Sequence, residues 1–513
     1  MAQIARWARA FPDKVAAHFP DRGTSLTYGA LDARANSIAQ WLIDLGLQPG
    51  DGIAMLMDNR PEFIELVYAC RRAGLYYTPL SVHLRPQEVA YMMTDAAAKV
   101  IIVSPGLAEL ATALLHEGVV GAVPRFAVGE GLAGYDSFED ALAGTPAPTE
   151  LPQRPVGREF LYSSGTTGLP KGIKRPMVSW ENRDAPDWDM TWKSLYGFDT
   201  DTVYLSPAPL YHAAPHGYAI RRTIGEGGTA VVMAKFDPLR ALELIERYHI
   251  THSQWVPTMF VRLLALPEEQ RRRFDLSSHR CAIHAAAPCP IAVKQRMMEW
   301  WGPILWEYYA GSEGVGTTVA APQDWMARPG TVGRPVNGVT LHICDDDGRE
   351  LPVGEVGRIC FEGAPRFAYH NAPDKTEAAY NARGWASLGD LGRVDEDGWL
   401  FLSDRRADLI LSGGVNLYPA EIEAVLVRHP AVAEVAVVGI PNEDFGEQVH
   451  AVIVPRDPRA DEVALRAELD ALCRDHLAGP KRPRSWEFVE ELPRSEAGKL
   501  LRRILKERYL TPS

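Results

Sequence analysis

The sequence predicts an α/β protein with a large amino-terminal domain, built on mostly parallel sheets flanked by helices plus a β-rich subdomain, and a small carboxy-terminal α+β domain. Apolar residues at helical spacing alternate along the chain with short apolar runs of strand length, which is typical of parallel sheets covered by helices. Other short runs are separated by Asp–Gly turns, which is typical of β-hairpins. The chain has 513 residues, a length at which one hydrophobic core usually divides into several domains.

The first clear element is a helix that begins after Thr27 and ends at Gly46. Its apolar residues recur every three or four positions, Thr27 can cap its first turn, and Gly46 is a typical C-terminal stop. Short buried strands are expected further along the chain, each closed by proline, serine or a charged residue, at 100–103, 203–205 and 230–233.

The β-rich subdomain is expected at 345–363, with Asp345–Gly348 as a turn, and at 393–402, where Asp397 and Gly398 separate two strands. Strand and helix patterns then return, with an amphipathic helix at 420–428 and strands at 432–439 and near 449–454. The polar segment at 403–410 is the most credible linker. We therefore predict an amino-terminal domain over 1–404 and a carboxy-terminal domain over 405–513.

Composition and charge exclude several classes of protein. The net charge is −12, so the chain lacks the basic surface of a nucleic-acid-binding protein. It contains no apolar run long enough for a transmembrane helix, and two arginines precede any apolar stretch, so no signal peptide is expected. The six cysteines form no CxxC pair, which favours buried, reduced thiols in a cytoplasmic protein over a zinc site or disulfides.

The strongest chemical signal is the segment 162–172, in which serine, threonine and glycine residues precede Lys171. Glycines allow close backbone approach, and backbone N–H groups, hydroxyls and an ammonium suit a polyphosphate. The segment is not a Walker A loop, because Gly165 and Gly168 lie too close together and no Ser or Thr follows Lys171. The alternative is a flexible Ser/Gly turn.

This segment resembles the phosphate loop of the adenylate-forming superfamily, which includes acyl-CoA synthetases, firefly luciferase and the adenylation domains of peptide synthetases. Further segments resemble the family's motifs in the family's order, from about residue 10 to residue 505; they are 284–288, 308–313, 385–390, 405–423 and 493–499. The resemblance implies an AMP-forming acyl-CoA synthetase. In such an enzyme a carboxylate attacks the α-phosphate of ATP, a small mobile domain rotates, and the thiol of coenzyme A then attacks the acyl-AMP.

The resemblance also implies roles for individual residues, each with a physical reason. Tyr309 offers a flat face for a purine, and Glu313 offers a carboxylate for Mg²⁺ held through phosphates. Lys499 would offset the repulsion between the α-phosphate and the substrate carboxylate. The expected catalytic residues are Lys499, Glu313 and Thr166. The expected ATP and AMP ligands are Ser163, Ser164, Gly165, Thr166, Thr167, Gly168, Lys171, Ala286, Ala287, Tyr309, Ser312, Asp390, Arg405 and Lys499.

Other residues are assigned by the same resemblance to the acid, to coenzyme A and to the domain junction. The acyl pocket is expected to include His212, Trp255, Thr258, His284 and Ala285. Trp255 and Thr258 stand at a strand end, where ligands of α/β proteins gather, so the pantetheine path is their alternative. His212 could equally be a core or surface histidine. Gly413 and Gly414 are expected to face the coenzyme A tunnel, or else to serve a turn with positive φ. The hinge is expected at Ala407 or Asp408.

The sequence departs from the family pattern at three places: at Ala285 and Ala286, at Ser312, which replaces the usual threonine and keeps its hydroxyl, and at Ala407. Ala285 and Ala286 stand where the family usually has glycine; an added methyl group can shape the pocket, which leaves the acyl selectivity open. Ala407 stands where the family usually has Asp or Lys, which leaves the identity of the pivot residue open.

The resemblance is strongest to bacterial ligases for fatty acids, bile acids and other bulky apolar acids. It implies Mg²⁺ as cofactor, ATP and coenzyme A as co-substrates, no nucleic-acid partner and no membrane span; peripheral membrane contact and homodimer formation stay open. Two other second steps remain open, namely transfer to a carrier protein and luciferase-like oxygenation. A non-catalytic binding protein is disfavoured, because Lys499, Glu313 and the phosphate loop are all present.

Overall fold

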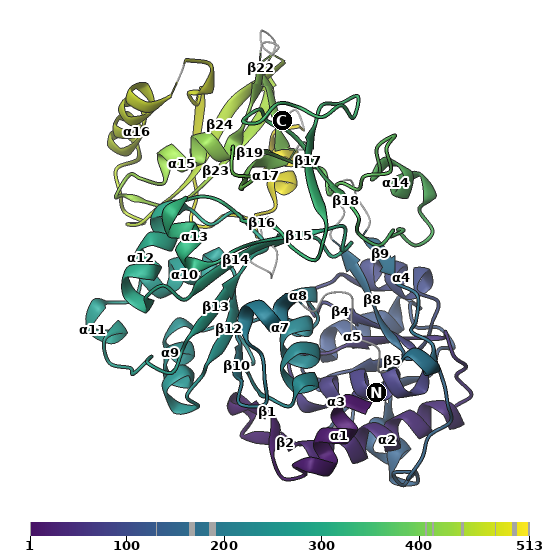
Figure 1. Cartoon of the computed structure of the whole chain (residues 1–513). Coiled ribbons are helices and arrows are strands. Elements are labelled where there is room, and N and C mark those ends of the chain that lie inside the picture. Colours follow the sequence, from purple (N-terminus) through teal and green to yellow (C-terminus); the bar gives the residue numbers. More distant parts are fainter. Residues whose placement is uncertain are drawn as a thin grey trace.

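The computed structural model describes residues 2–129, 131–163, 170–183, 191–405, 408–412, 415–442, 446–477, 479–494 and 500–510. In this part of the chain the strands form four sheets, two of them large, mainly parallel and flanked by helices (Figure 1). The predicted α/β class is therefore confirmed. No helix of the described ranges is both long and apolar enough to cross a membrane.

The first large sheet has the strand order β7-β6-β5-β3-β4-β8-β9. Its strands run parallel except for β9, which pairs antiparallel with β8. Thr27 caps helix α2 by accepting a hydrogen bond from the Ala30 amide at 3.2 Å, as the sequence predicted. The strands are β3 (Gly52–Leu56), β4 (Tyr76–Leu80), β5 (Ala98–Val103), β6 (Arg125–Ala127), β7 (Asp136–Ser137), β8 (Arg158–Ser163) and β9 (Lys171–Lys174), and the helices are α2 (Tyr28–Asp44), α3 (Pro61–Ala73), α4 (Pro86–Asp95), α5 (Ala108–His116) and α6 (Phe138–Ala143).

The second large sheet has the order β16-β15-β14-β13-β12-β10-β11-β1-β2 and is parallel from β1 through β14. The predicted strands at 100–103 and 203–205 are confirmed by β5 and β10, and the one at 230–233 by β11, which ends one residue earlier. The strands are β1 (Val15–Phe19), β2 (Thr24–Thr27), β10 (Val203–Ser206), β11 (Thr229–Val232), β12 (His252–Trp255), β13 (Cys281–His284), β14 (Leu305–Ala310), β15 (Thr317–Ala320) and β16 (Arg334–Pro335).

Helices cover both faces of the second sheet and create two hydrophobic cores. One core contains residues of α9, α10 and α12, and the other lies between this sheet and the first sheet, where the π-helix η4 packs against β10. The helices are α1 (Ala2–Ala10), α7 (Thr191–Tyr196), α8 (Ala213–His216), η4 (Gly217–Thr223), α9 (Pro238–Arg247), α10 (Pro257–Leu264), α11 (Glu268–Arg271), α12 (Ile291–Trp301) and α13 (Pro322–Ala327).

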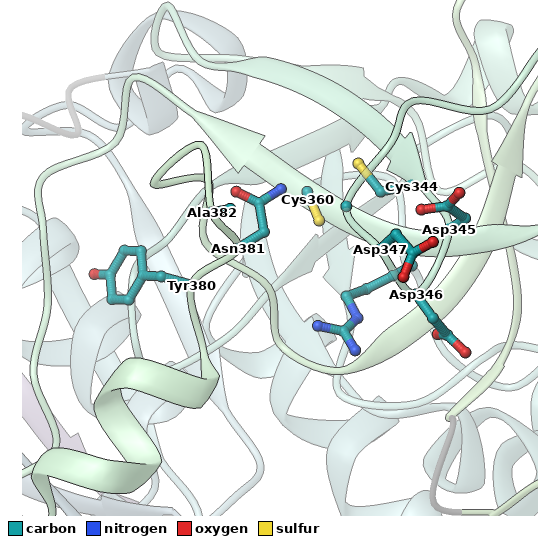
Figure 2. Close-up of a pocket in the computed structure, with 10 residues that line it drawn as sticks. Cys344, Asp345, Asp346, Asp347, Cys360, Tyr380, Asn381 and Ala382 are labelled. Carbon is teal, nitrogen blue, oxygen red and sulfur yellow. The ribbon is translucent and has the colours of Figure 1, made fainter.

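The β-rich subdomain is an antiparallel sheet of β17 (Thr340–Cys344), β18 (Gly357–Glu362), β19 (Asp390–Val394) and β20 (Leu400–Arg405), accompanied by helix α14 (Pro373–Ala378). The predicted turn at Asp345–Gly348 is confirmed, because the Gly348 amide donates to the Asp345 carbonyl at 3.2 Å and Gly348 has a φ of +78°. A polar pocket beside this turn is lined by the three aspartates 345–347, by Asn381 and by the buried thiols of Cys344 and Cys360 (Figure 2). All six cysteines are free, as expected.

The carboxy-terminal sheet has the order β22-β21-β24-β23, with β25 beside β24. The helix and strands predicted after Pro419 are confirmed. The strands are β21 (Ile410–Ser412), β22 (Val415–Leu417), β23 (Val432–Asn442), β24 (Gly446–Pro455) and β25 (Ser485–Phe488), and the helices are α15 (Pro419–Leu426), α16 (Glu462–His476) and α17 (Arg502–Leu510). Between Arg405 and Ile410 the chain leaves one sheet and enters another. The exact boundary at 404/405 stays a proposal.

Candidate active site

The ends of the predicted phosphate loop lie side by side at the carboxyl end of β8. Ser163 is the last residue of this strand and pairs with Lys171, the first residue of β9. Because β8 is parallel to β4, this position is one where α/β sheets commonly bind ligands. The predicted ligands Ser164, Gly165, Thr166, Thr167 and Gly168 lie outside the described residues.

Tyr369 connects the predicted phosphate lysine with the predicted metal carboxylate. Its hydroxyl donates to Glu313 Oε1 at 2.7 Å, and Lys171 Nζ lies 4.8 Å from the centroid of its ring. The contact depends on a bridge between Ile173 of β9 and Tyr369, residues far apart in the sequence. Tyr369 is not predicted by any sequence motif, and it lies outside the named strands and helices.

The segment that carries Ser312 and Glu313 is held from its other side by Arg175. Arg175 Nη2 donates to the Ser312 carbonyl at 2.9 Å, just beyond the end of β9. A methyl group on Gly311 would stand 2.7 Å from Glu313 Oε2, so glycine lets the carboxylate lie against the backbone. Glu313 is therefore oriented by contacts with both the backbone and Tyr369.

Tyr309 and Asp390 form a buried hydrogen bond between two sheets. The Tyr309 hydroxyl donates to Asp390 Oδ2 at 2.7 Å, and the two residues are only 9% and 8% exposed. Tyr309 belongs to β14, whereas Asp390 begins β19 and pairs across from Arg405 of β20. The structure thus brings together three of the predicted nucleotide residues, although the side chain of Arg405 is not described.

The loop after β13 contains a strained backbone. Ala286 has a φ of +75°, in the left-handed region that glycine adopts freely and that costs other residues about 1–2 kcal/mol. Its side chain is exposed, and Ala287 beside it is half-buried. Strain of this kind often concentrates at binding sites. Ala286 therefore adopts a backbone conformation that a glycine would adopt without strain.

A buried ion pair lies beneath this loop. Lys294 Nζ is 2.7 Å from Glu307 Oε2, and His284 Nε2 is 3.5 Å from the same oxygen. Burial raises the pKa of Glu307 and lowers the pKa of Lys294, and each partner opposes the shift of the other. Burial, reinforced by the nearby Lys294 ammonium, keeps the pKa of His284 well below its usual value. His284 is therefore a neutral imidazole that supports the loop from inside the core.

Three of the predicted acyl-pocket residues are neighbours at the carboxyl ends of β12 and β13, where Trp255 pairs with His284 and the Ala285 amide donates to the Trp255 carbonyl at 3.4 Å. Trp255 is fully buried and packs against Phe260 and Trp301, in the same core that His284 enters. His212 occupies the N-cap position of helix α8, without a side-chain capping hydrogen bond, and is half-buried beside Tyr211. Strand alternation and helix packing thus give Trp255 and His284 positions in the core, and their contact with an acid stays a prediction.

Two further predicted acyl residues lie near the carboxyl ends of the second sheet. Ala285 follows β13 and is buried, and Thr258 lies in the first turn of α10 and is half-buried. Both positions are compatible with the carboxyl edge at which ligands of α/β proteins gather. Their roles also stay predictions.

The junction residue Asp408 is tied to the carboxy-terminal domain. Its carboxylate lies 3.6 Å from Arg502 of α17, and Arg502 also donates to Glu423 of α15 at 2.6 Å. The described strands β21 and β22 pair Ser412 with Val415. The other predicted residues of this region, Ala407, Gly413, Gly414 and Lys499, lie outside the described residues.

Comparisons with known proteins identify the family of the chain. Residues 4–367 match the family described as AMP-binding enzyme, and residues 421–499 match the AMP-binding enzyme C-terminal domain. A feruloyl-CoA synthase of Amycolatopsis sp is 33% identical over 498 residues, which cover 95% of this chain and 94% of the relative. A fatty acid–[acyl-carrier-protein] ligase, ScoC of Streptomyces coeruleorubidus, is 32% identical over 504 residues, covering 95% of this chain and 92% of the relative. The structure of ATP-bound MatB from Rhodopseudomonas palustris matches with a TM-score of 0.82 and 31% identity, covering 99% of both chains.

The fold and the site thus define a nucleotide-dependent enzyme of the adenylate-forming class. The chain belongs to the AMP-binding enzyme family.

Proposed function

We propose that this protein activates a bulky carboxylic acid with a large apolar part to an acyl-AMP and then transfers the acyl group to coenzyme A. The observation that carries the proposal is the family match over 4–367, together with the match of the carboxy-terminal domain over 421–499. ATP-dependent acid–CoA ligase activity in general is supported by relatives named as CoA ligases and by a structural relative that holds ATP. The relatives' names give different acids, so the relatives do not determine which acid this enzyme activates, and the kind of acid is part of the proposal.

In the first step, a carboxylate oxygen of the acid attacks the α-phosphorus of ATP, and the bond to the β-phosphate oxygen breaks. This reaction needs alignment and charge neutralisation more than covalent help from the protein. Lys171 and the loop hydroxyls would hold the β- and γ-phosphates, while Tyr309 and Asp390 would hold the adenosine. Lys499 would place a cation between the reacting carboxylate and the α-phosphate, which lowers their repulsion as the new bond forms.

Glu313 fits a role in holding Mg²⁺. It is a half-buried carboxylate that Tyr369 orients at 2.7 Å. The described residues contain no cluster of three or more His, Cys, Asp or Glu side chains suited to a metal. Mg²⁺ characteristically uses one or two carboxylates together with phosphate oxygens, so a single glutamate is sufficient. When bound, Mg²⁺ would neutralise charge on the phosphates.

In the second step, the thiol sulfur attacks the acyl carbon, and AMP leaves with the electrons of the acyl–phosphate bond. Lys499 must withdraw first, so the carboxy-terminal domain would rotate about a hinge at Ala407 or Asp408. Because Arg502 holds Asp408 at 3.6 Å, this ion pair would have to follow the rotation or break. Gly413 and Gly414 would then face the pantetheine arm.

A carrier protein is the second candidate for the acyl acceptor. The observation that favours it is the 32% identity to a fatty acid–[acyl-carrier-protein] ligase, nearly the identity shared with a feruloyl-CoA synthase. Both acceptors present the same phosphopantetheine thiol, so the first half-reaction does not distinguish them.

The test measures pyrophosphate release from ATP with a panel of acids, followed by thioester formation with coenzyme A or a phosphopantetheinylated carrier protein. We expect pyrophosphate release with at least one acid and thioester formation with free coenzyme A. Lys499→Ala should slow pyrophosphate release about 10²–10³-fold, as expected for loss of one charge-stabilising group, while thioester formation from supplied acyl-AMP changes little. Pyrophosphate release by this variant at the wild-type rate would refute the role of Lys499. Thioester formation only on the carrier protein would show that the carrier protein, and not coenzyme A, is the acceptor.

A further inference from the structure

The last turn of helix α4 contacts the phosphate segment 162–172 near both of its ends (Figure 1). Asp95 is the last residue of α4 and is half-buried, and its Oδ2 accepts a hydrogen bond from the Tyr162 hydroxyl at 2.7 Å. Four residues earlier in α4, the Tyr91 hydroxyl donates to the Pro170 carbonyl at 3.2 Å. Two side chains of one helix therefore hold the beginning and the end of this segment.

The segment 369–371 joins the same aspartate to strand β9. Asn371 Nδ2 donates to Asp95 Oδ1 at 3.0 Å, and His370 Nε2 lies 3.1 Å from the Asp95 carbonyl oxygen. The His370 amide donates to the Gly172 carbonyl of β9 at 2.8 Å. Asn371 has a φ of +50°, in the left-handed region that asparagine adopts more readily than most residues. Asp95 thus accepts hydrogen bonds from both sides of the phosphate segment.

The contact between α4 and β9 leaves no room for a side chain at Gly172. A methyl group there would stand 2.7 Å from the Phe160 ring, 3.1 Å from the Tyr162 ring and 3.2 Å from Asp95 Oδ2. Tyr162 and Gly172 also pair across β8 and β9. The Asp95 carboxylate therefore packs close to the backbone of β9, one residue after Lys171.

The segment 369–371 also reaches the predicted metal carboxylate. Its first residue, Tyr369, forms a bridge with Ile173 of β9, donates to Glu313 Oε1 at 2.7 Å and lies with its ring centroid 4.8 Å from Lys171 Nζ. A displacement of this segment would therefore move Tyr369 and change the position of Glu313 relative to Lys171.

We propose that Asp95 is a positioning residue for the first half-reaction. By holding the segment 369–371 against β9, it sets the distance between the phosphate lysine Lys171 and the metal carboxylate Glu313. The inference rests on the proposed function and adds a residue that none of the sequence motifs includes. Lys171 and Glu313 would serve phosphates of one bound triphosphate, so their separation must match it, and a misplacement of about 1 Å can slow a reaction about a hundredfold.

The test measures the two half-reactions separately, with the best acid of the panel and with its acyl-AMP. Asp95→Ala should lower kcat/KM for ATP in pyrophosphate release about tenfold to a hundredfold and raise the Mg²⁺ concentration that gives half the maximal rate, while the KM for the acid stays unchanged. Thioester formation from supplied acyl-AMP should keep the wild-type rate, because pyrophosphate has already left and Lys171 has no phosphate to hold. Asp95→Asn keeps one acceptor oxygen, so its kcat/KM should lie between those of the wild type and Asp95→Ala.

Tyr369→Phe tests whether Asp95 acts through Tyr369. This variant keeps the ring beside Lys171 and removes the hydroxyl that donates to Glu313. Substitutions at coupled residues have effects that are not additive. The double variant Asp95→Ala/Tyr369→Phe should therefore lose less kcat/KM for ATP than the product of the two single losses.

Asp51→Ala is the matched control. Asp51 is also a half-buried aspartate of the first sheet, and its Oδ2 accepts from the Gln48 amide and from Lys99 Nζ, both at 2.8 Å. This variant removes two hydrogen bonds away from the segment 369–371, so it should lower the melting temperature and keep both half-reactions at the wild-type rate.

The inference is overturned if Asp95→Ala keeps the wild-type kcat/KM for ATP, or if it slows both half-reactions equally, as a purely structural residue would. Fully additive losses in the double variant would overturn the coupling through Tyr369. If Asp95→Ala does not fold, Asp95→Asn and Tyr162→Phe decide the question by the same two rates. Each of these results would leave the ligase activity of the wild type standing, whereas absence of pyrophosphate release by the wild type with every acid of a broad panel would refute the proposed function.

Discussion

Replacing Tyr309 by phenylalanine should weaken ATP binding while sparing the acid. The substitution keeps the aromatic ring that would stack on adenine and removes the hydroxyl that donates to Asp390 Oδ2 at 2.7 Å. The bond is short and ends on a carboxylate that is 8% exposed, so solvent replaces it poorly. Hydrogen bonds of this charged kind are worth about 1.5–3 kcal/mol. Asp390 would lose a donor that fixes the carboxylate expected to bind the ribose.

Because this hydrogen bond is already made before ATP binds, its free energy is the upper limit of the loss in binding; the KM for ATP should rise by up to about a hundredfold, since about 1.4 kcal/mol corresponds to a factor of ten. The assay is pyrophosphate release at saturating acid with varied ATP, followed by the reverse titration. Asp390→Ala should raise the KM for ATP further, because it removes both the ribose contacts and the partner of Tyr309.

The matched control is Tyr135→Phe, which also removes a buried hydroxyl. The Tyr135 hydroxyl donates to the Ala111 carbonyl at 3.0 Å, within the helices and strands of the first sheet and without contact to the predicted nucleotide residues. This variant should lose some stability and keep its KM for ATP. A wild-type KM for ATP in Tyr309→Phe, in an enzyme that still folds, would show that the Tyr309–Asp390 pair does not hold the nucleotide.

Three further predictions concern the second half-reaction, the core beneath the nucleotide loop, and pH. Gly414→Leu should still form acyl-AMP but lower acyl-CoA output by about tenfold or more; an equal fall in both half-reactions, with a lower melting temperature, would indicate a structural glycine instead. Lys294→Met should lower the free energy of unfolding in urea by about 3–5 kcal/mol, because it leaves the Glu307 charge buried without its partner at 2.7 Å. The double variant with Glu307→Leu should recover most of this loss. Burial lowers the pKa of His216 and of His252 to about 4, below the usual value of about 6.5. Below pH 6.5 the two histidines therefore become protonated in the unfolded chain but stay neutral in the folded chain. The free energy of unfolding should fall between about pH 6.5 and pH 4, by up to about 3 kcal/mol for each histidine. A free energy of unfolding that does not change over this range would contradict the assignment of neutral buried imidazoles.

The sequence alone was enough to predict the fold class, most of the elements tested and the family. The helix after Thr27 followed from apolar spacing and a capping side chain, and the turn at Asp345–Gly348 followed from local turn chemistry. Both are local properties, in which neighbouring residues decide the conformation. The family followed from motifs in a fixed order, and the match over 4–367 agrees with it.

Only the tertiary structure decided which side chains meet. Tyr369 contacts Glu313 because a backbone bridge to β9 brings together segments that are distant in the sequence, and no local sequence pattern predicts this contact. Strand alternation places both Trp255 and His284 in the core on one side of the sheet, and their assignment to the acyl pocket stays a prediction. Motifs and turns are determined by residues that are neighbours in the sequence, whereas the burial and partners of a side chain depend on residues hundreds of positions away.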